Sequence, residues 1–283
     1  MLNIGHFNQL KVIEIGAYGA ILDGGDSGRL LLSRRQCPTG LASGDELEVF
    51  IFLDAEGDPV PTTRRPAAEL NQITWLEVVE VNNLGAFVNW GLDKDLFIPF
   101  AEQQHSLNKG RHTLVRVYMD NQGRLAGSTR IDHWIKDESR GLKPGDKVSL
   151  MIADKTELGY KAIINHEYWG LLYANELYQR VRKGQVFDGY IKRIRKDGKV
   201  DLSLNQPGYS TGKMQGITGE ILAALEENNG FLALTDKSPP NEIYAAFKVS
   251  KKVFKQAIGA LYKQRRIALE SKGIRKIASH EES

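Results

Sequence analysis

The order of apolar and polar residues predicts strands in the first three quarters of the chain and helices in the last quarter. Segments such as "ELEVFIFL" from Glu46 and "LVRVYM" from Leu114 alternate with period two, so each strand has one buried and one exposed face. After "NQPG" at 205–208 the alternation stops, and apolar residues recur every three or four positions. The pattern therefore predicts antiparallel β domains followed by a helical domain.

The strand region contains one pattern in three copies. Gly16 begins "GAYGAIL", Gly85 begins "GAFVNWG" and Gly159 begins "GYKAIIN". In each copy a second apolar strand follows, then a glycine with an alternating strand, then a polar turn with glycine. The first interval between glycines is 28, 25 and 25 residues, and the second is 13, 13 and 14 residues. Because order and spacing are nearly constant, we predict three copies of one structural unit.

Each unit is predicted to be a small barrel. The turns "AEGD", "NQGR" and "KDGK" are hairpin signals, since glycine or asparagine supplies the positive φ. About five short strands with one buried face close most economically into a barrel, which also removes exposed edges. We place the three barrels at residues 1–66, 67–138 and 139–208.

Residues 209–283 are predicted to form a winged-helix domain. "SPPNEIYAAFKV" fits a helix entered through prolines, Ser250 fits the N-cap of a further helix, and "RIALESKGIRKI" fits a hairpin. The predicted fold class is mainly β with a C-terminal α+β domain. The residues expected on the inner faces of the first and third helices are Ile217, Ile221, Leu222, Leu225, Val253, Phe254, Ala257, Ile258 and Leu261.

Composition is that of a soluble globular protein, with 41% hydrophobic and 26% charged residues. No apolar run approaches the roughly 20 residues that span a bilayer, and the N-terminus lacks the pattern of a signal peptide. The only cysteine, Cys37, excludes an internal disulfide and fits a reducing compartment. We expect a cytoplasmic protein with no membrane partner, and a structural role for this cysteine.

The net charge of +3 conceals an asymmetry. Residues 1–140 contain 14 Lys and Arg against 19 Asp and Glu, whereas residues 141–283 contain 24 against 16. A basic half is expected of a protein that binds a polyanion, although an ordinary solvated lysine surface has the same composition.

Two of the repeats resemble the S1 RNA-binding motif, an OB-fold barrel. The similar segments are "LGAFVNW" with "DLFIPFAE", and "GLLYANEL" with the closing strand "KVDLSL". Three S1-like units followed by a winged helix resemble the bacterial CvfB/YitL family (conserved virulence factor B), whose members are described as RNA-binding regulators of virulence gene expression. The resemblance implies RNA binding and post-transcriptional regulation.

The S1 motif implies stacking aromatics at set positions. The residues two positions after the first glycine are Tyr18, Phe87 and Lys161. The third copy therefore has a cation in place of the stacking aromatic. The second platform position holds Tyr173 in the third copy and Pro99 in the second, where Phe97 is close by. Trp90 and Trp169 would extend these faces. The alternative for every aromatic is core packing.

Two basic segments are candidate phosphate contacts. Residues 180–199 carry a net charge of +6 on a predicted hairpin, and the third predicted helix is also basic. The alternatives are a solvated hairpin and a protein-binding winged helix. The candidate cations of the third barrel are Arg180, Arg182, Lys183, Lys192, Arg193, Arg195, Lys196 and Lys199; those of the winged helix are Lys251, Lys252, Lys255, Lys263, Arg265 and Arg266.

No catalytic signature is present, so we expect a protein that is not an enzyme and needs no cofactor. The sequence has no GxxxxGK[ST] or HExxH motif. Its six histidines, including His280, do not have the spacing of a metal-ligand set. Asp93 and Asp95 are predicted to lie in a polar turn and not to form a metal site.

The preferred hypothesis is a protein that binds single-stranded RNA with low sequence specificity. Its basic surface would lie on the third barrel and the winged helix. One alternative is a DNA-binding transcription regulator acting through the winged helix. The other is an adaptor for a ribonuclease, the ribosome or a polymerase, with the first two barrels binding protein.

Overall fold

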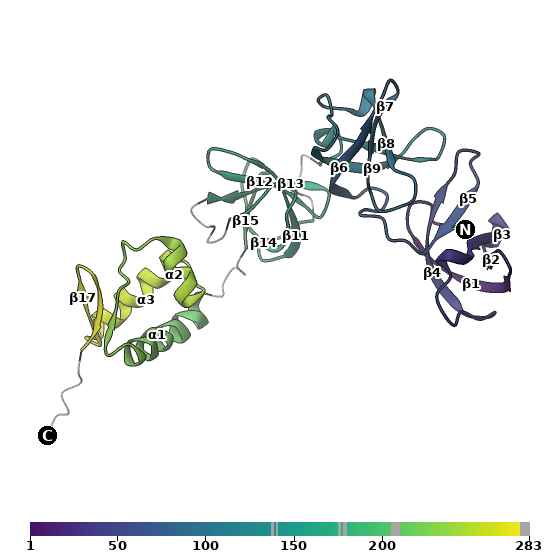
Figure 1. Ribbon diagram of the computed structural model, residues 1–283. Helices are drawn as coiled ribbons and strands as arrows, with labels where there is room; N and C mark the ends of the chain where they lie inside the picture. Colours follow the sequence, from purple (N-terminus) through teal and green to yellow (C-terminus); the bar gives the residue numbers. More distant parts are fainter. Residues whose placement is uncertain (137–138, 140, 175–176, 178–179, 205–209, 278–283) are drawn as a thin grey trace. The chain divides into compact units, whose positions relative to one another are not determined.

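The computed structural model describes residues 1–136, 139, 141–174, 177, 180–204 and 210–277, with the backbone alone for 210–216. Figure 1 shows three parts built from strands, followed by the part that carries helices α1, α2 and α3. Within the described part of the chain, no helix has the length and apolar character that crossing a membrane requires.

The first two parts are five-stranded antiparallel sheets, named here barrels 1 and 2. Their strand orders are β3-β2-β1-β4-β5 and β10-β9-β6-β7-β8. In each, the two outermost strands lie close together, which curls the sheet. Barrel 1 contains β1 (Phe7–Gly16), β2 (Gly19–Asp23), β3 (Arg29–Ser33), β4 (Glu46–Leu53) and β5 (Pro59–Thr62), with 3-10 helices η1 (Gly25–Ser27) and η2 (Arg34–Gln36). Barrel 2 contains β6 (Ile73–Val81), β7 (Gly85–Val88), β8 (Leu96–Pro99), β9 (His112–Met119) and β10 (Leu125–Ser128), with η3 (Phe100–Glu102) and η4 (Ile131–His133).

The third part, barrel 3, is a closed barrel of order β11-β12-β13-β15-β14. Parallel pairing between β13 and β15 closes it, for example between Gly170 and Val200. Its strands are β11 (Lys147–Lys155), β12 (Gly159–Ile164), β13 (Tyr168–Tyr173), β14 (Val186–Ile194) and β15 (Val200–Ser203).

The first strand of every barrel is bent by a bulge. Register shifts follow Val12 in β1, Val78 in β6 and Ile152 in β11. Residues before the bulge pair mainly with the fourth strand, and those after it pair with the second strand. Since a bulge bends the strand and increases its twist, one strand takes part in both halves of each barrel.

A glycine begins the second strand of each barrel because the facing backbone is too close for a side chain. A Cβ on Gly19, Gly85 or Gly159 would lie 1.9, 2.4 or 2.0 Å from a backbone oxygen of the third strand. The prediction that Gly16 opens the first copy is therefore wrong, since Gly19 has this role. Counted from Gly19, the interval to the next repeat glycine, Gly44, is 25 residues, as in the other two copies.

The C-terminal part has three helices and a three-stranded sheet of order β16-β18-β17. The inner-face residues predicted for the first and third helices are buried, apart from Val253, which is partly buried against the same core. The Ser250 hydroxyl accepts a hydrogen bond from the Val253 N–H at 3.0 Å, which confirms the N-cap. The elements are α1 (Ser210–Glu227), β16 (Phe231–Leu232), α2 (Pro240–Phe247), α3 (Lys251–Lys263), β17 (Ile267–Glu270) and β18 (Gly273–Lys276).

The predicted fold class is confirmed: the chain is mainly β, with OB-type barrels and a C-terminal winged helix. It divides into two compact units, Met1–Ile135 and Lys136–Ser283. The strands of each barrel fall within its predicted range, while the domain boundaries stay predictions, those at 138 and 208 lying at residues outside the described ranges.

A buried carboxylate joins three strands of barrel 3. Asp201 on β15 is 1% exposed, and its Oδ2 accepts hydrogen bonds from Arg193 Nε and Nη2 at 3.1 and 2.6 Å. Its Oδ1 accepts from Arg195 Nε and Nη2 at 2.8 and 2.6 Å and from the Tyr173 hydroxyl at 3.3 Å. Burial would raise the pKa of Asp201, but the hydrogen bonds from Arg195 and Arg193 outweigh it and lower the pKa.

Replacing the repeat glycine should destabilise its barrel. Gly159→Ala places a methyl group against the backbone of β13, so we expect a loss of roughly 1–3 kcal/mol in the free energy of unfolding of barrel 3. Gly219→Ala in α1 is the control, because a Cβ there meets nothing within 4 Å. Hydrogen exchange of barrel 3 amides measures the effect, and unchanged protection in Gly159→Ala would contradict the packing argument.

Asp201 should stabilise barrel 3 in a pH-dependent way. Asp201→Asn leaves two guanidinium groups without their carboxylate, which should cost roughly 1–3 kcal/mol at pH 7. Because the folded pKa lies below the unfolded value of about 3.9, the stabilisation is present above that pH and is lost as the pH falls toward the folded pKa. In urea denaturation, the difference in the free energy of unfolding between wild type and variant should therefore become smaller below about pH 4.

The control for this variant is Asp188→Asn. Asp188 is an exposed carboxylate of the same barrel, paired with Lys147 at 2.7 Å. Its loss should change stability little, because exposed ion pairs contribute little. The ionised Asp201 carboxylate is proposed to stabilise barrel 3. A difference in the free energy of unfolding between wild type and Asp201→Asn that stays constant from pH 7 to pH 3 would contradict this role.

Candidate nucleic-acid interface

Barrel 3 carries a cavity of about 520 Å³, bounded by β12, β13 and the β14–β15 turn. Its volume is in the range of ligand sites, about 300–1,000 Å³. Among the residues that the structure describes, Asp197 is the one carboxylate in its lining. The cations and aromatic rings of the lining are Lys136, Lys161, Arg195, Lys199, Tyr168 and Trp169.

Strand pairing brings a cation and an indole ring together in this cavity. Lys161 on β12 faces Leu171, and Ile163 faces Trp169 on β13. Because side chains two residues apart share a face of the sheet, Lys161 and Trp169 are diagonal neighbours. The Lys161 Nζ lies 3.6 Å from the centroid of the Trp169 ring, which is a cation–π contact. The cation at the aromatic position of the S1 motif therefore lies beside an aromatic ring.

A second cation and a second ring, which are not among the predicted site residues, also line the cavity. Lys136 forms an isolated β-bridge with Tyr168, and its Nζ lies 5.4 Å from the Tyr168 ring. The Nζ also donates to Glu167 at 2.6 Å, and this hydrogen bond raises the pKa of Lys136. The available signal for Tyr168 was its place beside the predicted Trp169 in "EYWG", whereas no motif marks Lys136.

Three further candidates surround Asp201. Arg193 and Arg195 both bind this carboxylate, so the two cations and one anion carry a single net positive charge. Arg195 also lines the cavity and donates to the Tyr173 hydroxyl. Tyr173 is half-buried, with the Lys192 Nζ 6.0 Å from its ring, and it does not line the cavity. Asp201 itself was missed, although a charged residue replaces the apolar Val60 and Ala126 of the other copies.

Of the remaining predicted cations of barrel 3, only Lys199 is among the described residues that line the cavity. Arg180, Arg182 and Lys196 are exposed, and none of them lines the cavity. Lys183 lies 3.4 Å from Asp154, and Lys199, which does line the cavity, lies 3.4 Å from Asp197. The structure thus brings Lys161, Trp169, Arg195 and Lys199 together out of the predicted set.

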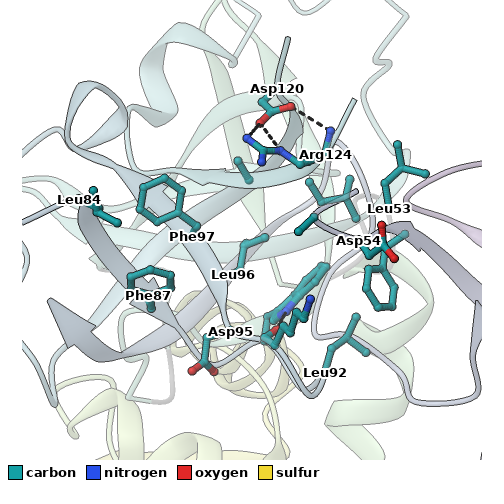
Figure 2. A pocket seen from close by; sticks show the side chains of 16 residues that line it. Leu53, Asp54, Leu84, Phe87, Leu92, Asp95, Leu96, Phe97, Asp120 and Arg124 are labelled. Atoms are coloured by element: carbon teal, nitrogen blue, oxygen red, sulfur yellow. Dashed lines mark hydrogen bonds and ion pairs between the residues drawn. The ribbon is translucent and has the colours of Figure 1, made fainter. Parts of the chain in front are cut away.

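Barrel 2 has its own cavity, of about 350 Å³, which contains the predicted aromatics Phe87 and Phe97 (Figure 2). These half-buried rings face each other across β7 and β8, with centroids 5.1 Å apart. Trp90 is 4% exposed, and its indole N–H donates to the Lys94 carbonyl at 2.7 Å. Trp90 lines the same cavity as Phe87 and Phe97, but it does so as a residue of the core and not as an exposed stacking surface.

Tyr18 does not occupy the motif position assigned to it. Since Gly19 is the repeat glycine of barrel 1, the residue two positions later is Ile21, which pairs with Leu31. Tyr18 lies in the turn between β1 and β2 and is 84% exposed.

The winged helix presents cations along α3. Lys252, Lys255 and Lys263 are exposed, as are Arg265 and Arg266 just after the helix, whereas Lys251 is half-buried. The spacing of Lys252, Lys255 and Lys263 places them near one face of the helix. Lys255 also pairs with Asp236 at 3.3 Å.

Among the described residues, no group of three or more His, Cys, Asp or Glu side chains could hold a metal ion. Of the histidines considered above, His280 lies outside the described ranges.

Comparison with known proteins gives two domain matches. Residues 4–64 match an S1 domain, and residues 219–275 match the CvfB-like winged helix domain. A multidomain protein with nucleic acid binding domains from Streptococcus pneumoniae has a solved structure with a TM-score of 0.41 and 24% identity, covering 97% of this chain and 98% of that one. S1 and winged-helix domains bind nucleic acids and are typically non-catalytic.

Two relatives are similar over most of their length. YitL of Bacillus subtilis is 26% identical over 89% of this chain and 86% of its own. Conserved virulence factor B of Staphylococcus aureus is 26% identical over 95% of this chain and 92% of its own. Together with the two domain matches, these similarities confirm the resemblance of this chain to the CvfB/YitL family.

Proposed function

We propose that this protein binds single-stranded RNA through the cavity of barrel 3, with low sequence specificity and without catalysing a reaction. The supporting observation is the combination of four cationic side chains and two aromatic rings in that cavity. Single-stranded nucleic acids are bound by such combinations, because cations track the phosphates and any base can stack on a ring.

The contact between Lys161 and Trp169 suits this role. The ammonium group lies over one face of the ring, 3.6 Å from its centroid, so a base would stack on the other face or after Lys161 has moved aside toward a phosphate. A duplex would not present an unstacked base to this ring, so the geometry favours single strands. Arg195 is held by Asp201 and Lys199 is on the adjoining turn, and both line the cavity, so these cations would contact phosphates of the same strand.

The winged helix is proposed as a second contact for the same ligand. Lys252, Lys255 and Lys263 on α3, with Arg265 and Arg266, provide an exposed cationic surface. DNA binding through this helix is the competing possibility, and duplex DNA in competition with RNA distinguishes the two. We further propose that the protein acts in the cytoplasm as a post-transcriptional regulator.

Removing cations of the cavity should weaken RNA binding and its dependence on salt. In Lys161→Gln/Lys199→Gln, two phosphate contacts are lost, and the slope of log affinity against log salt should fall in magnitude by about 1.4, which is roughly 0.7 per contact. Fluorescence anisotropy with a labelled single-stranded oligonucleotide at several salt concentrations measures this. Lys143→Gln is the control, since Lys143 is exposed on the same barrel and does not line the cavity. A wild-type affinity that is independent of salt would overturn the proposal.

Trp169→Ala should weaken binding without altering the salt slope, because a stacking surface is removed and no cation is lost. The expected loss is about 1–3 kcal/mol, or roughly 5- to 150-fold in affinity. Phe100→Ala is the control, as Phe100 is 55% exposed on barrel 2. Wild-type affinity in Trp169→Ala would show that the cavity does not stack bases.

A further inference from the structure

The cavities of barrels 2 and 3 lie at equivalent places in the repeat. The pair Phe87 and Phe97 on β7 and β8 corresponds in register to Lys161 and Leu171 on β12 and β13. Counted back from the turn glycines at 123 and 198, Asp120 corresponds to Arg195. The same site of the fold therefore has two different linings.

The barrel 2 lining is unsuited to a phosphate chain. Its charged residues are three carboxylates and two cations, whereas the described lining of the barrel 3 cavity has one carboxylate and four cations. Arg124 is bound by the Asp120 carboxylate, at 3.2 Å from its Nε and 3.1 Å from its Nη2. Burial would raise the pKa of Asp120, but hydrogen bonds from the backbone of Arg124 and Gln122 and from the Arg124 side chain outweigh it and lower the pKa. Asp120 is thus ionised at neutral pH, and the lining repels an anion.

The walls of this cavity are largely apolar, and two barrels contribute to them. Phe87 and Phe97 form one wall, and Leu84 beside them is 64% exposed (Figure 2). The residues 52–55 of the β4–β5 hairpin of barrel 1 line the cavity as well. Monomeric proteins seldom leave a hollow of this kind exposed unless something binds there.

We propose that the barrel 2 cavity binds a short segment of a partner protein that carries a large apolar side chain next to a lysine or arginine. The apolar side chain would pack on Phe87 and Phe97, and the cation would pair with Asp95, an exposed carboxylate of the lining. Asp54 is a weaker anchor, since its Oδ1 already accepts hydrogen bonds from the N–H groups of Glu56 and Asp58. Charge complementarity and apolar walls together specify the ligand, independently of RNA binding by barrel 3.

An array of synthetic hexapeptides in three composition classes tests this proposal on the full-length protein. The classes are basic with apolar, acidic with apolar, and basic with small polar residues. We expect the basic–apolar class to retain the protein preferentially. Phe87→Ala and Asp95→Lys should each weaken that binding by about tenfold, which corresponds to the loss of roughly 1.4 kcal/mol. Asp26→Lys, an exposed carboxylate of barrel 1 outside the cavity, should bind as wild type does.

Equal retention of the acidic–apolar class, or unchanged binding by both cavity variants, would overturn the proposal. So would a loss of RNA affinity in Asp95→Lys or Phe87→Ala as large as that in Trp169→Ala, because the cavity would then be an RNA site. Asp95 is exposed, so Asp95→Lys keeps the test valid if Phe87→Ala disturbs the fold. If the barrel 3 variants bind RNA as the wild type does, the proposed RNA site fails. The peptide proposal is then still decided by the peptide array, because it concerns a different cavity.

Discussion

The bend in the first strand of each barrel is the constraint on which the rest of the structure depends. The bulges after Val12, Val78 and Ile152 allow one strand to pair with two others, and seven residues later a glycine admits the close approach of the third strand. A side chain at that glycine would separate the second and third strands, which carry the lining of both cavities. The repeated geometry fixes where the cavities form, and the side chains on these strands then determine their chemistry.

Charge distinguishes the copies at one position of the β-hairpin turn. In barrels 1 and 2, Asp54 and Asp120 accept hydrogen bonds from backbone N–H groups of their own turns. Barrel 3 has Arg195 there, and its guanidinium is balanced by the buried Asp201, where the other copies have Val60 and Ala126. These two substitutions convert a turn cap into a cation held at the edge of the cavity. Stability and binding are therefore linked in barrel 3, because the carboxylate that joins its strands also positions a candidate phosphate contact.

Periodicity and repeat spacing predicted the strand and helix regions, the helical core and the Ser250 cap, because these depend on local sequence. The misplacement of Gly16 arose because two glycines lie three residues apart, and only strand register distinguishes them. Lys136, Tyr168 and Asp201 could not be placed from a motif, since their proximity to the cavity follows from pairing between distant segments. The sequence around Trp90 does not distinguish a buried tryptophan from an exposed stacking residue. Only its packing in the folded chain shows that it belongs to the core.

The most direct test of the central claim is to map RNA contacts on the intact protein by photo-cross-linking. A single-stranded oligonucleotide containing 4-thiouridine is irradiated with the protein, and the cross-linked peptides are identified by mass spectrometry. If the barrel 3 cavity stacks bases, cross-links should concentrate on the β13 residues Tyr168 and Trp169, which line it. Cross-links confined to barrels 1 and 2, with none on β13, would contradict the account.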